Sequence, residues 1–192
     1  PANIELAGLE TALVNIMSRE TVMRQYLDKM RGQYEYILID CIPSLGMITI
    51  NALVAADYVL IPVESAYLPV KGLQQLIKTI GRVHRKLNPS LEILGILLTK
   101  VDRRTNFARD ISAQIREAYG DRVHIFENCI PLSVRAAETA AEGKSIYLQD
   151  PRGTVAEGYL SLTEEVLASA GGGDKPAGDG GHPGTGKGGG RQ

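Results

Sequence analysis

The sequence predicts an α/β fold built on a parallel sheet, because short apolar runs alternate with longer stretches of helical periodicity. Four runs are predicted to be strands, and they cover Tyr36–Asp40, Asp57–Val63, Ile93–Thr99 and Val123–Ile130. Strands that alternate with helices form βαβ units, in which the strands are parallel and helices cover the sheet. The first run is apolar almost throughout, which is typical of a strand buried on both faces.

Five helices are expected between and after these strands, over Met47–Ala56, Val70–Leu87, Thr105–Tyr119, Ser133–Glu142 and Thr154–Ala168. Another apolar-periodic segment precedes the first strand, over about Asn3–Met30, and it breaks near Ser18. The Ser18 hydroxyl is placed to cap a second helix there, and Gly32 is a plausible end for that helix.

The composition changes abruptly after Ala170. The stretch from Gly171 to Gln192 is half glycine and has no apolar periodicity. Such a segment buries too little apolar surface to offset the entropy lost on ordering. We therefore expect a folded domain over residues 1–170 and a disordered, glycine-rich tail over residues 171–192.

The overall composition excludes several classes of function. A net charge of −1 gives no global signature of nucleic-acid binding, so any basic surface must be local. No apolar run is long enough to cross a bilayer. Cys41 and Cys129 lie in apolar contexts, which favours reduced thiols over a disulfide. His84, His124 and His182 share no ligand spacing with each other or with the cysteines, so a metal site built on them is not expected.

The first apolar run leads directly into Asp40, and Pro43, Ser44 and Gly46 follow it. Ligands bind at the carboxyl ends of strands in open α/β sheets. The Asp40 carboxylate is therefore well placed to hold a magnesium ion, mostly through water, beside the phosphates of a nucleotide. Two simpler interpretations stay open: a strand-end aspartate that caps the next turn, and an ordinary Pro-Ser-x-Gly turn before a helix.

Four stretches of the chain resemble the ParA/Soj group of partition ATPases, which carry a deviant Walker A phosphate loop. They are YEYILIDCIPSLGMITINAL (34–53), AADYVLIPV (55–63), GILLTKVDRRTN (95–106) and the segment 130–146, which contains IPLSVRAAE and EGKSI. The resemblance implies a three-layer sandwich of the P-loop NTPase type. The family's K-G-G-x-G-K-T loop is not found, so we expect the carboxyl-terminal two-thirds of such a domain, incomplete at its N-terminus.

The resemblance also implies roles for individual residues. Asp40 would be the Walker B aspartate, which holds Mg²⁺ through water, and the loop with Pro43, Ser44 and Gly46 would lie beyond it. The base of ATP would be lined, largely through backbone groups, by Thr99, Ile130 and Pro131.

Two arginines, Arg104 and Arg135, align with positions that face DNA in the family. A second basic feature comes from the residues alone, because the stretch 65–90 contains no Asp or Glu. Its cations recur on one predicted helix face, at Lys71, Lys78, Arg82 and Arg85. Both a solvated helix face and a DNA-binding surface fit this pattern.

The resemblance implies an ATP-gated homodimer that binds DNA without sequence preference and responds to a DNA-bound partition partner. The protein would be bacterial, cytoplasmic and associated with the nucleoid. Because the phosphate loop is not found, we expect this chain alone neither to bind ATP tightly nor to hydrolyse it. We also expect poor solubility or dependence on a partner, since a missing neighbouring strand would expose the apolar edge at Tyr36–Asp40.

The alternative is a non-catalytic module, left by truncation, that binds DNA or a partner protein. A membrane-cycling relative of the MinD type is disfavoured, because the glycine-rich tail offers no basic amphipathic helix. One segment departs from a common family form, which has Gln and Glu where this chain has Glu64 and Ala66. Contacts of that segment with a dimer partner or its nucleotide are therefore in doubt.

Overall fold

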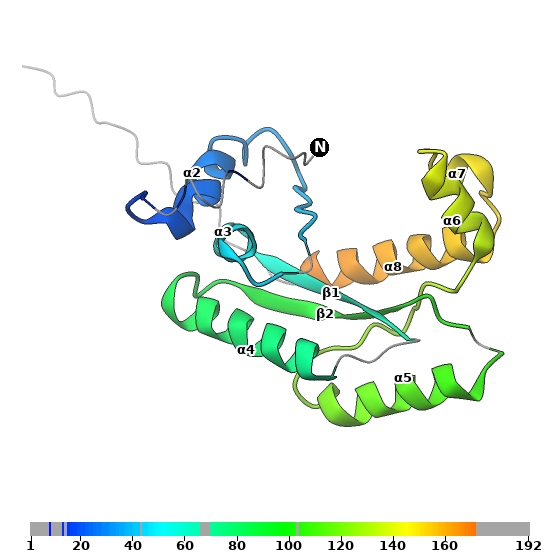
Figure 1. The fold of residues 1–192 in the computed structure, drawn as a ribbon. Coiled ribbons are helices and arrows are strands. Elements are labelled where there is room, and N and C mark those ends of the chain that lie inside the picture. Colours follow the sequence, from blue (N-terminus) through cyan, green and yellow to red (C-terminus); the bar gives the residue numbers. More distant parts are fainter. Residues whose placement is uncertain are drawn as a thin grey trace, which may run out of the picture.

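The computed structural model describes residues 8, 13, 15–42, 44–65, 70–102 and 104–171. Helices lie on both faces of a short parallel sheet (Figure 1). This arrangement confirms the predicted α/β class. The glycine-rich segment beyond residue 171, and most of the segment before residue 15, lie outside the described residues.

The sheet contains two regular strands, β1 (Tyr58–Glu64) and β2 (Glu92–Thr99), which pair in parallel. Both were predicted within one residue at each end. The predicted strand Val123–Ile130 pairs with the other edge of β2 only in places, through the bridges Ile96–Ile125 and Val101–Pro131. Three parallel segments therefore lie in the order β1, β2 and 123–131.

The predicted strand Tyr36–Asp40 is wrong for this structure. Residues 36–42 form no strand and pair with neither edge of the sheet in the described part of the chain. The segment is largely exposed, and the Leu38 side chain has 96% of its surface in contact with solvent. An apolar run becomes a strand only where a neighbour supplies backbone hydrogen bonds, and the described residues offer no such neighbour here.

Each face of the sheet has its own apolar core. Side chains from one face, including Ile61, Ile96 and Leu98, pack with residues of α4 (Val70–Lys86) and α5 (Asn106–Tyr119). On the opposite face, Leu97 packs with Val155 and Leu162 of α8 (Thr154–Gly171). The two clusters make three layers, helix–sheet–helix, as expected for the fold class.

Among the described elements, the remaining helices are α2 (Val22–Asp28), α3 (Met47–Ala55), α6 (Val134–Ala141), α7 (Ile146–Gln149) and the 3₁₀ turn η1 (Arg19–Thr21). All five predicted helices are present, and each of their ends lies within three residues of the predicted one. The predicted Ser18 side-chain cap is wrong, because Ser18 adopts a left-handed conformation and its hydroxyl caps nothing. Instead, the Thr21 hydroxyl donates to the Ser18 carbonyl at 2.8 Å.

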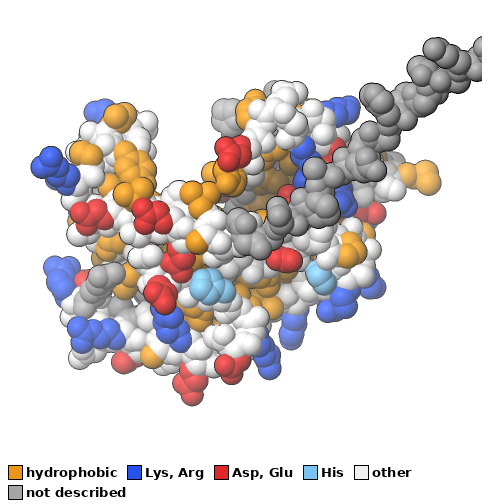
Figure 2. Space-filling view, turned by 180° about the vertical axis from the view of Figure 1, so that it is seen from behind, with side chains coloured by type: hydrophobic (Ala, Val, Ile, Leu, Met, Phe, Trp, Pro, Cys, Tyr) orange, Lys and Arg blue, Asp and Glu red, His pale blue; other side chains and the backbone are white. Residues whose placement is uncertain are grey.

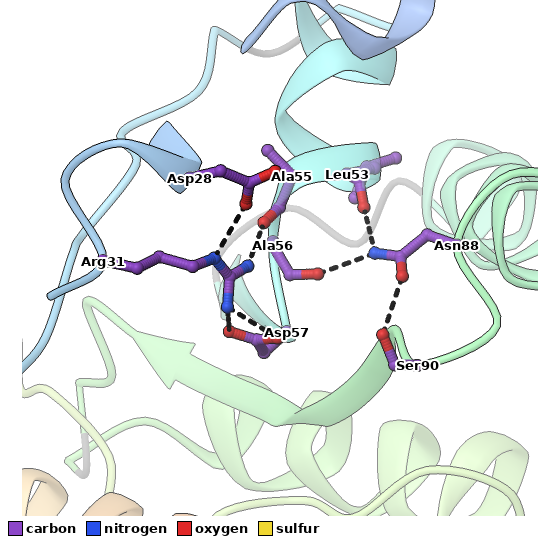
Figure 3. A network of polar contacts seen from close by, with 8 residues as sticks. All are labelled: Asp28, Arg31, Leu53, Ala55, Ala56, Asp57, Asn88 and Ser90. Carbon is purple, nitrogen blue, oxygen red and sulfur yellow. Dashed lines mark hydrogen bonds and ion pairs between the residues drawn. The ribbon is translucent and has the colours of Figure 1, made fainter. Parts of the chain in front are cut away.

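The carboxyl end of α3 is held by two side chains from distant parts of the chain (Figure 3). Arg31 donates to the Ala55 carbonyl at 3.1 Å and forms ion pairs with Asp28 and Asp57. The Asn88 amide donates to the carbonyls of Leu53 and Ala56 at 3.1 and 2.7 Å. These bonds satisfy carbonyl groups that a helix end leaves without partners, and they fix α3 against the start of β1.

Candidate functional site

The carboxyl end of β2 brings together the three residues predicted to line the base of a nucleotide. The Ile130 amide donates to the Leu98 carbonyl at 2.9 Å, and the Val101 amide donates to the Ile130 carbonyl at 3.0 Å. Thr99 and Pro131 therefore lie at the same edge, one on each side of this pairing. The structure shows the juxtaposition, while the contact with a base stays a prediction.

Lys100 lies at the same edge and was given no role by sequence reasoning. Its φ of +52° is in the left-handed region, which a non-glycine residue adopts at a cost. Its Nζ lies 3.0 Å from the Glu64 carboxylate, and its carbonyl accepts a hydrogen bond from the Ser65 hydroxyl at 3.1 Å. The exits of β1 and β2 are thus tied together at the point where the sheet ends.

The Glu64–Lys100 ion pair involves one of the two positions at which this chain departs from a common family form. Glu64 stands where a common family form has Gln, and here its carboxylate has a cation 3.0 Å away. The only sequence signal for this pair was the position of both residues at strand ends. Because both side chains are about half exposed, the pair orders the two exits without a large contribution to stability.

Asp40, the predicted magnesium ligand, is exposed and lies in the unpaired segment 36–42. Burial of the neighbouring Cys41 thiol raises its pKa, and the charge of Asp40 raises it further. Among the described residues, no group of three or more His, Cys, Asp or Glu side chains could hold a metal ion. Magnesium needs only one or two carboxylates when water and phosphates complete its shell, so this finding does not test the predicted role of Asp40, which stays a prediction.

The described residues contain no loop that would cradle the phosphates of such a nucleotide. They therefore fit one part of an Mg–ATP site, and no catalytic step follows from them.

The loop after Asp40 closes a turn before α3. Pro43 lies outside the described residues. The Ser44 carbonyl accepts a hydrogen bond from the Thr49 hydroxyl at 2.7 Å, and the Gly46 amide lies 3.5 Å from the Ser44 hydroxyl oxygen. Gly46 is the N-cap residue of α3, and no side chain caps this end. These contacts support the interpretation of an ordinary turn, and they leave the predicted nucleotide-facing role of Ser44 and Gly46 open.

The two arginines predicted to face DNA both have acidic partners. Arg104 makes two side-chain bonds to Asp102, at 2.9 and 3.1 Å, and Arg135 lies 3.5 Å from Asp150. The hydrogen bond from the Arg104 side chain is the main cause that lowers the pKa of Asp102. A phosphate would have to compete with these carboxylates for either arginine.

No helix among the described residues is long and apolar enough to span a membrane. This finding concerns the described residues alone.

The architecture is that of a three-layer α/β protein, and its candidate site lies at the carboxyl ends of parallel strands. The family model described as "AAA domain" matches residues 1–93. A solved structure of cobyrinic acid a,c-diamide synthase from Mycobacterium smegmatis, with bound ADP and magnesium, is 32% identical. It superposes with a TM-score of 0.66 over 75% of this chain and 63% of that one. The fold is therefore that of the P-loop NTPase-like α/β proteins.

Two curated relatives identify the family. The sporulation initiation inhibitor protein Soj of Bacillus subtilis is 44% identical over 88% of this chain and 66% of its own length. The chromosome partitioning protein ParA of Myxococcus xanthus is 42% identical over 87% of this chain and 58% of its own length. The chain belongs to the ParA/Soj family, and it spans about three fifths of the length of these relatives.

Proposed function

We propose that this chain carries part of a partition ATPase that acts in the segregation of a chromosome, plasmid or mobile element. The observation that carries the proposal is the 42% identity to a chromosome partitioning protein over 87% of the chain. The protein would act in the bacterial cytoplasm on DNA of the nucleoid, as a homodimer gated by ATP. A DNA-bound partner protein would stimulate it.

ATP and Mg²⁺ are the proposed cofactors. A relative 32% identical to this chain was solved with ADP and magnesium. In this chain Asp40 would hold magnesium through water, and the edge at Thr99, Ile130 and Pro131 would contact the base. The bound metal and phosphates would supply electrostatic stabilisation of phosphoryl transfer. The residues described here would position the base and one side of the metal shell.

A chimera tests this function. The part of Bacillus subtilis Soj that precedes the matched region is joined to this chain, and phosphate release is measured with ATP, Mg²⁺ and duplex DNA. We expect hydrolysis by the chimera and its loss on Asp40→Ala. The unfused chain should release no phosphate above a heat-inactivated control. A folded chimera with no hydrolysis, or one that is indifferent to Asp40→Ala, would contradict the proposal.

The second candidate is a module without catalysis that binds DNA or a partner protein. One observation favours it: several exposed cations of α4, including Lys78 and Arg82, have no acidic partner among the residues that the structure describes. Retention of DNA by the unfused chain without nucleotide, weakened by rising salt, would support this candidate. Retention that requires both ATP and the Soj segment would support the first.

A further inference from the structure

The third parallel segment of the sheet carries two more residues than its pairing with β2 needs. Its Phe126 amide donates to the Ile96 carbonyl at 3.0 Å, and its Ile130 amide donates to the Leu98 carbonyl at 2.9 Å. The two carbonyls lie two positions apart in β2, whereas the two amides lie four positions apart in the segment. Residues 127–129 therefore form a bulge, which ends directly before the edge proposed to face the base.

The alternation of side chains does not by itself decide this register. Two residues are one full repeat of a strand, so an insertion of two leaves each side chain on the face that it would otherwise occupy. Phe126 and Ile130 accordingly belong to the same apolar core, the one formed with α8. In a register without the bulge, the Asn128 amide would replace the Ile130 amide at the Leu98 carbonyl. Contacts outside the sheet therefore help to decide which of the two amides pairs with β2.

Glu165 of α8 supplies such a contact. Its carboxylate accepts hydrogen bonds from the backbone amides of Glu127 and Asn128, at 2.9 and 3.4 Å, and from the Asn128 side chain at 2.9 Å. The His124 ring lies 3.4 Å from the same carboxylate. Hydrogen bonds to a charged acceptor are about twice as strong as those between neutral groups. The carboxylate thus occupies the amide that a register without the bulge would need.

A second contact with α8 lies at the other end of the bulge. A Cβ at Gly158 would lie 3.2 Å from the Cys129 carbonyl oxygen and 3.4 Å from the Pro131 ring, so glycine permits a close approach here. Gly158 and Glu165 are about 10 Å apart along α8. An extended chain covers about the same length from residue 127 to residue 130. Helix α8 therefore contacts the bulge at both of its ends.

The acceptor in this cluster is better shielded from water than the ring beside it. The side chain of Glu165 is 19% exposed, whereas that of His124 is 48% exposed. Histidine side chains are visible at the surface of the face that Figure 2 shows. Water competes less for a partly buried carboxylate than for a surface ion pair, so the bonds from the bulge to Glu165 are the more persistent part of the cluster.

We propose that Glu165 is a positioning residue for the nucleotide site, because its carboxylate holds the bulge that sets which backbone groups lie at Ile130 and Pro131. The inference rests on the proposed function for its ligand, the base of ATP, and it adds what fixes the base-facing edge. Glu165 itself would touch neither the base nor the metal. Its loss would remove the acceptor of two bulge amides, and the edge would open or shift by two residues, about 7 Å along β2.

Hydrogen exchange of the full chain, followed amide by amide by NMR, tests the contact. The variant is Glu165→Gln, which keeps the shape of the side chain but has only one acceptor oxygen and no charge. We expect the two amides bonded to Glu165, and that of Ile130, to exchange at least tenfold faster than in the wild type. The amides of Ile96 and Phe126, which pair before the bulge, should change by less than about threefold. Glu164→Gln is the matched control, since it changes an exposed neighbour on the same helix.

A second measurement separates positioning from stability. Adenosine is titrated into the labelled full chain at up to about 10 mM, and the shifts of the Thr99 and Ile130 amides give its affinity. We expect Glu165→Gln to bind adenosine at least threefold more weakly than the wild type, at a temperature where both are folded. Gly158→Ala should also weaken binding, by about threefold, because its Cβ displaces the edge from α8. This change raises the helix propensity of α8, so a weaker helix would not explain the loss.

The outcomes distinguish this inference from the proposed function. The inference is overturned, with the proposed function intact, if Glu165→Gln exchanges like Glu164→Gln. It is also overturned if every amide of Glu165→Gln exchanges faster by one common factor, which indicates a uniform loss of stability, or if adenosine binds the variant and the wild type equally. If adenosine shifts no amide of this edge in the wild type, the base-facing assignment fails and the inference fails with it. Hydrolysis by the Soj chimera tests the ATPase function separately.

Discussion

Asn88 offers the sharpest test of how the fold is held together. The residue is 1% exposed and lies just after α4, yet its side chain bonds to the end of α3. Its amide donates two hydrogen bonds to main-chain carbonyls, and its Oδ1 accepts one from the Ser90 hydroxyl at 2.9 Å. Replacement by alanine removes all three bonds and leaves two helix-end carbonyls without this donor.

The expected cost follows from these contacts. A net hydrogen bond contributes about 1 kcal/mol, and a buried polar group left unpaired costs about 1–3 kcal/mol. We therefore expect Asn88→Ala to lower the free energy of unfolding by about 2–4 kcal/mol. For a chain of this size that corresponds to a fall in Tm of roughly 5–15 °C. Asn88→Asp keeps the volume but replaces the donor with an acceptor, so it should be at least as destabilising.

Urea unfolding followed by circular dichroism at 222 nm measures this difference. Ser90→Ala is the control, because it removes one bond to the same side chain from an exposed position and should cost about 0.5–1 kcal/mol. A loss below about 0.5 kcal/mol in Asn88→Ala, or an Asn88→Asp variant more stable than Asn88→Ala, would refute the reasoning.

For three other substitutions, the structure indicates whether stability or aggregation should rise or fall. Gly95→Ala places a Cβ 2.8 Å from the Phe126 ring, and thermal unfolding should show a loss of about 1–3 kcal/mol. For Glu165, burial alone would raise the pKa, but hydrogen bonds from the backbone amides of 127–128 and from the side chains of Asn128 and His124 lower it below the ordinary 4.5. The wild type should therefore be more stable than Glu165→Gln above pH 4.5, and the difference should shrink as the pH falls below that value. Leu38→Lys removes a 96% exposed leucine, so light scattering should show less aggregation with unchanged secondary structure.

Each of these three substitutions has a matched control. Gly81→Ala meets only the end of an arginine side chain at 3.5 Å, so it should stabilise α4, and an equal loss in both glycine variants would contradict the packing argument. Glu164→Gln changes an exposed neighbour of Glu165, and it should not alter the acid dependence of stability. Leu148→Lys removes another leucine, 82% exposed on α7, and should suppress aggregation less than Leu38→Lys.

The long periodic helices were predictable because each pairs a wide apolar face with a charged one. The segment 123–130 was predicted to be one continuous strand. It is interrupted, because two of its backbone amides donate hydrogen bonds to a side chain of α8 and not to β2. Glu165 on α8 accepts hydrogen bonds from the amides of Glu127 and Asn128, at 2.9 and 3.4 Å, so these two do not pair with β2. Local apolar character gave no signal of this competition, since the acceptor lies nearly forty positions away.

In the candidate site, too, some features were predicted from the sequence and others were not. The family resemblance grouped Thr99, Ile130 and Pro131 as neighbours, and the pairing of β2 with 123–131 brings these three residues to one edge of the sheet. Sequence reasoning could not detect that Arg104 is engaged by Asp102, since side-chain geometry decides whether two residues with this spacing meet. It also gave no signal for the left-handed Lys100, because backbone conformation at a strand exit depends on the tertiary contacts that close it.

The two halves of the candidate site differ in what fixes them. The edge at Thr99 and Lys100 is held by hydrogen bonds that lie entirely within the described chain, from β1 on one side and from 130–132 on the other. Asp40 lies between an anchored α3 and an anchored α2, on a segment that shares no strand pairing with either edge of the sheet. Asn51 of α3 links the two helices, because its side-chain amide donates to the Arg19 carbonyl and its side-chain oxygen accepts from the Met23 backbone amide. No strand pairing among the described residues therefore fixes the Asp40 carboxylate, whereas hydrogen bonds within the described chain fix the edge at Thr99 and Lys100.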